Sequence, residues 1–224
     1  MSYIIGIDEV GLGPVLGPMV VAGICIEKSA IKKLKKTGVK DSKLFGSGLN
    51  AHNKRKQIWE SIQDKISNYC YKIISAEQID KYYTEGIKIC DLELFVIKDI
   101  LIELNYSIAD IIYIPQIGML KKENMLKKLK SCQLYVDNIS EKIVYEKDAD
   151  TKFIPVATAS ILAKIIRDTE VEKLCNNLGK NYISGYPNHN TESFIREYFN
   201  KYKCLPIGVR KTRKWKPLQE ILSL

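Results

Sequence analysis

Two neighbouring carboxylates, Asp8 and Glu9, end a short apolar run near the start of the chain, within GIDEVGLGPVLGP at residues 6–18. Because neighbouring residues of a strand point to opposite faces, we expect the glycine-rich bend to break the pleat and turn Glu9 back toward Asp8. Two carboxylates at a strand end suit Mg²⁺ or Mn²⁺, which take oxygen ligands and keep waters for substrate phosphates. An ordinary acidic turn is the alternative.

The elements that must position these acids are predicted as alternating strands and helices. Short β-branched runs predict strands at residues 3–8, 19–26, 69–76 and 109–115. Apolar residues at helical spacing predict helices at residues 50–66, 88–105, 121–131, 156–179 and 190–199. Two further apolar runs occupy residues 133–137 and 141–148. The order of these predicted strands and helices along the chain indicates a mixed α/β fold.

Composition limits the class of protein. The chain has 224 residues, and its 35 Lys and Arg against 26 Asp and Glu give a formal charge of +9, which favours an anionic partner. No apolar run is long enough for a membrane span, and Asp8 and Glu9 interrupt the only stretch that could serve as a signal peptide. Six cysteines without a C-x-x-C pair predict reduced, structural thiols. We therefore expect one principal domain in the cytoplasm.

Positive charge is concentrated near the C-terminus. The stretch KYKCLPIGVRKTRKWK, residues 201–216, holds seven basic residues and no acidic one, with Tyr202 and Trp215 between them. Such a tail could follow a phosphate backbone. A solvated basic surface is the alternative, because charge runs are usually solvated.

Four separate blocks of the sequence are GIDEVGLGPVLGPMVVAG at 6–23, KDSK at 40–43, KDADTKFIPVATASILAKIIRD at 147–168 and SGYPNHNT at 184–191. In these residues, and in their order and spacing, the chain resembles ribonuclease HII, the type 2 ribonucleases H. The resemblance implies an α/β, RNase H-like mixed sheet flanked by helices, with a helical C-terminal extension. It places the RNase H-like catalytic domain at residues 1–175, and the helical extension with the basic tail at residues 176–224.

The same resemblance implies an activity. Such enzymes are endonucleases that cleave the RNA strand of RNA–DNA hybrids or ribonucleotides embedded in duplex DNA. Two divalent ions, Mg²⁺ or Mn²⁺, do the chemistry, so no protein nucleophile is required. The expected partner is therefore nucleic acid, with no membrane, and we expect a monomer.

Site residues follow from matching the blocks position by position. Asp8, Glu9 and Asp168 match the catalytic, metal-binding acids. Asp168 could instead be a plain solvated residue beside Arg167. The positions that match substrate-contacting or site-supporting residues are Gly11, Leu12, Gly13, Lys43, Ser160, Lys164 and Tyr186. Tyr186 matches the aromatic that packs on the sugar at the RNA–DNA junction, and the glycines allow a close backbone approach to a 2′-hydroxyl.

Two departures from the resemblance affect the function. Leu12 stands where an arginine is usual, and Pro115 stands in the strand-end slot of the third acidic ligand. Asp137 is a substitute candidate, but only about ten residues remain from Asp137 to the KDAD block at Lys147, and a parallel crossover needs a dozen or more. The alternatives are a catalytically impaired nucleic-acid-binding relative and a nuclease with shifted substrate choice.

Overall fold

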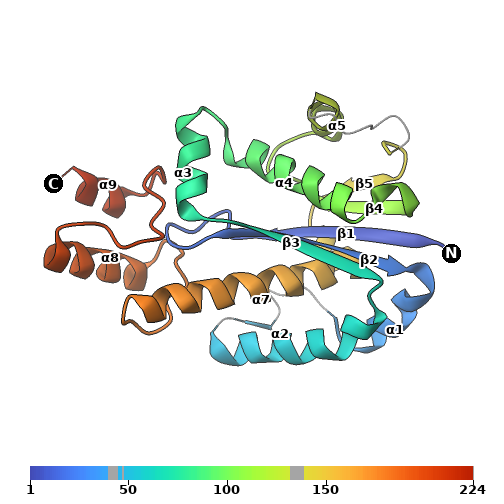
Figure 1. Cartoon of the computed structure of the whole chain (residues 1–224), viewed down its shortest axis with the longest axis horizontal. Helices are drawn as coiled ribbons and strands as arrows, with labels where there is room; N and C mark the ends of the chain where they lie inside the picture. Colours follow the sequence, from blue (N-terminus) through green and yellow to red (C-terminus); the bar gives the residue numbers. More distant parts are fainter. Residues whose placement is uncertain (40–44, 47, 132–138, 224) are drawn as a thin grey trace. The chain divides into compact units, whose positions relative to one another are not determined.

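The computed structural model describes residues 1–39, 45–46, 48–131 and 139–223 (Figure 1). The chain forms two compact units, each assembled from three segments. The first unit comprises Met1–Val10, Val20–Lys72 and Cys90–Ile165, and the second comprises Gly11–Met19, Ile73–Ile89 and Ile166–Leu224. The predicted domain division after residue 175 stays a prediction.

Among the described residues, five strands form one sheet in the order β3-β2-β1-β4-β5. The strands are β1 (Tyr3–Val10), β2 (Met19–Glu27), β3 (Asn68–Ile74), β4 (Ala109–Pro115) and β5 (Ile143–Glu146). β1 runs antiparallel to β2 and parallel to β4, and β4 runs parallel to β5. β2 is buried along nearly its whole length and β1 through its middle, because both lie inside the sheet. This mixed sheet confirms the predicted fold class.

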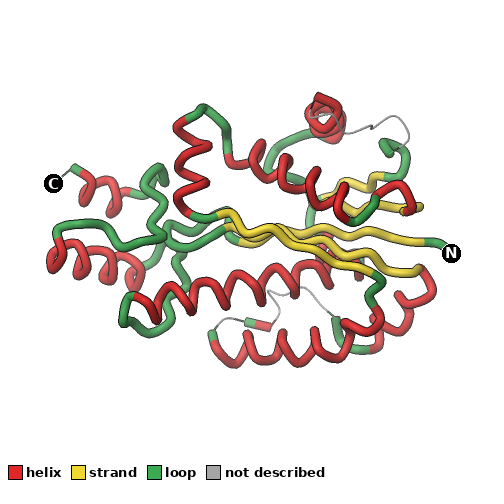
Figure 2. Tube along the Cα trace, in the orientation of Figure 1, coloured by secondary structure: helices red, strands yellow, loops and turns green. Residues whose placement is uncertain are grey.

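Helices make up most of the remaining described chain (Figure 2). They are α1 (Ile31–Lys36), α2 (Leu49–Ile62), α3 (Ala76–Thr84), α4 (Ile89–Glu103), α5 (Lys122–Ser131), α6 (Ala149–Lys152), α7 (Ile154–Asn177), α8 (His189–Tyr202) and α9 (Lys216–Leu222). Short 3-10 turns are η1 (Lys28–Ala30), η3 (Gln63–Lys65) and η4 (Tyr106–Ile108). In the part of the chain that the structure describes, no helix combines the length and the apolar character that crossing a bilayer requires.

In the first unit, helices cover both faces of the sheet. Figure 1 shows α4 on one face, and α2 with the start of α7 on the other. Two glycines permit this close packing. A Cβ on Gly6 would lie 2.3 Å from the backbone carbon of Pro155 in α7, and a Cβ on Gly23 would lie 2.4 Å from the Ile100 side chain of α4. The same face of β1 therefore presents Gly6 and, two residues later, Asp8 to α7.

The second unit has its own apolar cluster. Its buried members come from three distant stretches of sequence: Val15, Leu16, Phe194, Ile195, Val209, Leu218 and Ile221. Leu16 also forms an isolated antiparallel bridge with Val209. The segment that follows β1 is thus anchored by α8, α9 and the stretch between them.

We predict that Gly6→Ala destabilises the fold by about 3 kcal/mol, at the upper end of overpacking costs, because the new methyl meets rigid backbone. Gly23→Ala is the matched control in the neighbouring strand. Its methyl meets side-chain atoms, chiefly of Ile100 and Leu104, and no backbone atom, so we expect a smaller loss. Urea unfolding of both variants measures the difference. An equal or smaller loss for Gly6→Ala contradicts the packing argument.

Candidate active site

Asp8 is the centre of an acidic group in the first unit. Its side chain is buried, with 7% exposure, near the end of β1. The Ser160 hydroxyl of α7 and the Glu9 backbone N–H donate hydrogen bonds to its carboxylate. Burial, with the charges of Glu9 and Asp150, still holds the pKa of Asp8 well above its usual range. The site therefore disfavours the negative charge that Asp8 would carry in water.

The predicted break in the pleat between Asp8 and Glu9 is wrong. The β1–β2 ladder continues without a shift through Asp8↔Ala22, Glu9↔Val21 and Val10↔Val20. The left-handed bend comes only at Gly11, whose φ is +94°. Pairing with β2 keeps the strand regular for two residues beyond the point at which we expected it to turn.

Asp150 is a member of the acidic group that the sequence reasoning did not single out. It lies in the short helix α6, is 7% exposed, and its charge raises the pKa of Asp8. The available signal was its place in KDAD, inside a block that carried the family resemblance. Two carboxylates within electrostatic range of each other raise the cost of ionising either of them in a buried site.

Glu93 of α4 is a further buried acid, only 1% exposed. Its Oε2 atom has no hydrogen-bond partner among the described residues. Burial, and then the Asp8 charge, raise the pKa of Glu93 to about 8. The apolar pattern of residues 88–105 predicted a largely buried helix, but it did not single out this glutamate.

The carboxylate oxygens of the acidic group are ligands of the kind that a hard divalent cation prefers. Within the described ranges, no three His, Cys, Asp or Glu side chains are already arranged to hold a metal ion. Mg²⁺ needs only one or two carboxylates, since it keeps several waters and takes substrate phosphates as ligands. The unpartnered Oε2 of Glu93 and the buried carboxylates of Asp8 and Asp150 supply oxygens of the kind that such a cation binds.

The second unit contains the glycine loop, defined here as residues 11–17. Two of its backbone N–H groups, those of Val15 and Leu16, donate to the Gly185 carbonyl at 2.8 and 3.1 Å. A Cβ on Gly13 would lie 3.4 Å from the Tyr186 ring. The structure thus places the predicted loop residues Gly11, Leu12 and Gly13 in the same unit as Tyr186.

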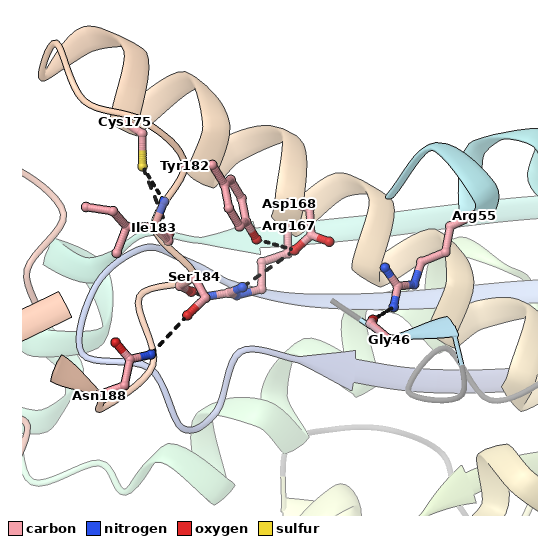
Figure 3. A network of polar contacts seen from close by, with 9 residues as sticks. All are labelled: Gly46, Arg55, Arg167, Asp168, Cys175, Tyr182, Ile183, Ser184 and Asn188. Carbon is pink, nitrogen blue, oxygen red and sulfur yellow. Dashed lines mark hydrogen bonds and ion pairs between the residues drawn. The ribbon is translucent and has the colours of Figure 1, made fainter. Parts of the chain in front are cut away.

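Asp168 lies in this second unit, in a network on α7 (Figure 3). It is 5% exposed, so it is not a plain solvated residue. The Tyr182 hydroxyl donates to Asp168 Oδ1 at 3.2 Å, and Arg167 Nη1 lies 3.7 Å from the same oxygen. Arg167 also donates from Nη2 to the Ser184 carbonyl at 2.8 Å.

The other predicted site residues have different outcomes. Ser160 contacts Asp8, as described above, and Lys164 lies one turn further along α7, half-buried. Pro115 is the last residue of β4. Lys43 and Asp137 lie outside the described residues.

Arg210 was predicted as part of a basic tail, but it is buried, with 1% exposure. Its Nε donates to the Gly17 carbonyl at 3.0 Å, and its Nη1 donates to the Leu12 carbonyl at 3.4 Å. By contrast, the lysines of this stretch are exposed, as a phosphate-following tail requires: Lys201, Lys203, Lys211, Lys214 and Lys216. A run of charges in the sequence did not reveal which member packs inside.

Comparison with solved structures defines the class of the fold. The chain is similar to the ribonuclease H2 of Pyrococcus horikoshii OT3, with a TM-score of 0.80, 28% identity, and coverage of 99% of this chain and 97% of that one. It is also similar to ribonuclease HII in a PCNA complex from Archaeoglobus fulgidus, with a TM-score of 0.77, 28% identity, and 97% and 96% coverage. The architecture is that of the ribonuclease H fold.

Sequence comparison identifies the family within that class. The family model for ribonuclease HII matches residues 5–215. A ribonuclease HII from Thermococcus sibiricus is 37% identical over 217 residues, covering 96% of this chain and 89% of the relative. The chain belongs to the ribonuclease HII family, which confirms the predicted resemblance.

We predict that the metal-free protein loses stability as the pH rises from about 5 to about 8. The pKa of Glu93 is about 8 in the folded chain against an ordinary value of 4.5, so the folded state binds more protons than the unfolded state between these values. The free energy of unfolding then falls with pH, at most by about 1.4 kcal/mol per pH unit for one proton.

Urea unfolding in EDTA across this pH range tests the expectation. Glu93→Gln should flatten the fall. Glu103→Gln is the control, since Glu103 lies on the same helix but pairs with Lys72 at the surface. Equal slopes for the wild type and Glu93→Gln contradict the assignment of the proton to Glu93.

Proposed function

We propose that the protein is a divalent-metal-dependent endonuclease that cleaves the RNA strand of RNA–DNA hybrids, or ribonucleotides embedded in duplex DNA. The observation that carries the proposal is the acidic group. Asp8 is buried, and Asp150 and Glu93 are buried within electrostatic range of it, in a chain of the ribonuclease HII family. Members of this family use divalent metals. The proposed cofactor is Mg²⁺ or Mn²⁺.

Each acid has a proposed task. Asp8, Glu9 and Asp150 hold the ions, and Ser160 fixes the Asp8 carboxylate by its hydrogen bond. When bound, the ions supply an activated water and stabilise the leaving oxygen. Asp168 as a metal ligand stays a prediction. Its present contacts with Tyr182 and Arg167 also suit a role in fixing that arginine.

The substrate-facing residues remain as proposed from the resemblance. Gly11, Leu12 and Gly13 would approach the 2′-hydroxyl through the main chain, which is how a close backbone contact distinguishes RNA from DNA. Tyr186 would pack on the sugar at the junction. Lys43 and Lys164 would hold the backbone near the scissile phosphate, and exposed lysines of residues 201–216 would add salt-dependent contacts. The monomeric state and the cytoplasmic location stay predictions.

The alternative is a catalytically impaired nucleic-acid-binding relative, and it rests on Pro115 and Leu12. β1 and β4 pair in parallel with Gly6 opposite Tyr113. Continued by two residues, this register sets Pro115 opposite Asp8. A proline there supplies no carboxylate, so the proposal assigns the missing negative charge to Asp150.

Cleavage of a labelled duplex with one embedded ribonucleotide, in Mn²⁺, tests the proposed function. We expect Asp8→Asn and Asp150→Asn each to lower kcat/KM at least about a hundredfold, because metal ions contribute several kcal/mol to transition-state stabilisation. Asp99→Asn, at an exposed acid of α4, should leave cleavage unchanged. Asp168→Asn, run in parallel, decides whether that acid belongs with the ligands. Salt-sensitive binding of the duplex without cleavage by the wild type supports the impaired alternative.

We further predict that Pro115→Asp lowers the Mn²⁺ concentration for half-maximal cleavage by about tenfold, equivalent to about 1.4 kcal/mol. The new carboxylate would add an oxygen ligand beside Asp8. Gln116→Asp adds the same charge one residue further on, beyond the end of β4, and should change the requirement much less. If both variants lower the required Mn²⁺ concentration equally, the cause is the added negative charge and not an oxygen ligand at position 115.

A further inference from the structure

The Tyr186 ring has two close neighbours within the second unit. The guanidinium carbon of Arg167 lies 5.1 Å from the ring centroid, which is within the range of a cation–π contact. A Cβ on Gly13 would lie 3.4 Å from the Cε1 atom of the ring, so the ring also packs against the glycine loop. Tyr186 is nevertheless 36% exposed. The ring is therefore held in place and still accessible to a ligand.

The backbone just before Tyr186 is fixed by the same arginine. Arg167 donates from Nη2 to the Ser184 carbonyl at 2.8 Å. Gly185 follows with a φ of +76°, and a Cβ there would lie 2.2 Å from the Leu16 carbonyl oxygen, so only glycine fits. Arg167 thus acts on Tyr186 both through its ring and through the chain that leads into it.

Arg167 itself has little freedom to turn. It is 0% exposed, and its Nε atom lies 3.0 Å from the position that a Cβ on Gly11 would occupy. Its Nη1 atom lies 3.7 Å from Asp168 Oδ1, an ion-pair distance. Because the guanidinium is a planar fork, turning it would break either the bond to Ser184 or the pairing with Asp168. The orientation of Arg167 therefore depends on where the Asp168 carboxylate lies.

Tyr182 in turn holds the Asp168 carboxylate (Figure 3). The Tyr182 hydroxyl donates to Asp168 Oδ1 at 3.2 Å. Burial, and then the Asp168 charge, raise the pKa of this hydroxyl, so it stays protonated well above neutral pH and serves as a donor. The contacts thus form a chain that runs from Tyr182 through Asp168 and Arg167 to Tyr186.

We infer that Tyr182, Asp168 and Arg167 are positioning residues that set the orientation of the Tyr186 ring, and through it the preference for a ribonucleotide at an RNA–DNA junction. The inference assigns Asp168 to the arginine and not to a metal ion, since its carboxylate already has a donor and a cation beside it. It rests on the proposed function for the contact of Tyr186 with the sugar, and on the contacts above for the orientation of the ring.

The junction preference is measured as the ratio of kcat/KM for a duplex with one embedded ribonucleotide to kcat/KM for an all-RNA/DNA hybrid. We expect Arg167→Lys, which keeps the charge but loses the planar fork, to lower this ratio about tenfold. Tyr182→Phe, which removes one hydroxyl, should lower it about threefold. The matched controls are Arg196→Lys and Tyr198→Phe, at half-buried residues of α8, and they should leave the ratio unchanged. Merely structural damage lowers both rates and leaves the ratio as it is, and that result overturns the inference.

A double-mutant cycle shows whether the hydroxyl of Tyr182 acts through Tyr186. In a Tyr186→Leu background the aromatic ring is absent, so adding Tyr182→Phe should cause no further loss of junction preference. An equal loss in both backgrounds overturns the inference, because the hydroxyl then acts by another route. Since Arg167 is fully buried, Tyr182→Phe decides the test if Arg167→Lys does not fold.

A spectroscopic test needs no nucleic acid. In protein labelled with ring-¹³C tyrosine, the NMR resonance of Tyr186 is assigned by its loss in Tyr186→Phe. We expect Tyr182→Phe and Arg167→Lys to shift this resonance toward that of free tyrosine, and Tyr198→Phe to leave it in place. An unmoved Tyr186 resonance in Tyr182→Phe overturns the inference. If the resonance shifts but the wild type neither binds nor cleaves either substrate, the positioning holds and the proposed function has failed.

Discussion

The constraint on which the site depends is the cost of burying a carboxylate. Asp8 reaches its position because Gly6, two residues earlier on the same face of β1, lets α7 approach to backbone contact at Pro155. The same approach brings Ser160 within hydrogen-bonding range of Asp8 and excludes water from it. Close packing therefore raises the free energy of ionising Asp8, since one hydroxyl and one N–H do not replace full hydration of the charged carboxylate. The divalent cation of the proposed function would offset this cost.

Most of the regular structure was predictable because the patterns were strong. The strands at 3–8, 19–26, 69–76 and 109–115 and all five predicted helices occur within a few residues of their expected bounds. α3 was missed although Ser75 and Gln78 form a capping box, since the apolar spacing that follows is short. The sequence also could not show that β1 continues regularly to Val10, because its pairing with β2 is a tertiary contact that overrides the local turn signal.

The site residues that the sequence predicted are those that stand out from their immediate neighbours in the chain. Asp8 and Glu9 stood out because acids are rare inside an apolar run, and Gly11 because a left-handed bend favours glycine. Asp150, Glu93 and Arg210 did not stand out, since each lies among other charged residues and only folding decides which of them is buried. Burial of a charged side chain is a property of the packed chain, and one sequence gives no separate signal for it.

The two units each bury a group of like charges, of opposite sign, and each can be considered by itself. In the first unit the group is acidic, at Asp8, Asp150 and Glu93. In the second it is mainly basic, at Arg167 and Arg210, with the buried Asp168 beside Arg167. Any single small ion would stabilise one group and leave the other as it is. The divalent cations of the proposed function would stabilise the acidic group, and the phosphates of its proposed substrate would stabilise the basic one.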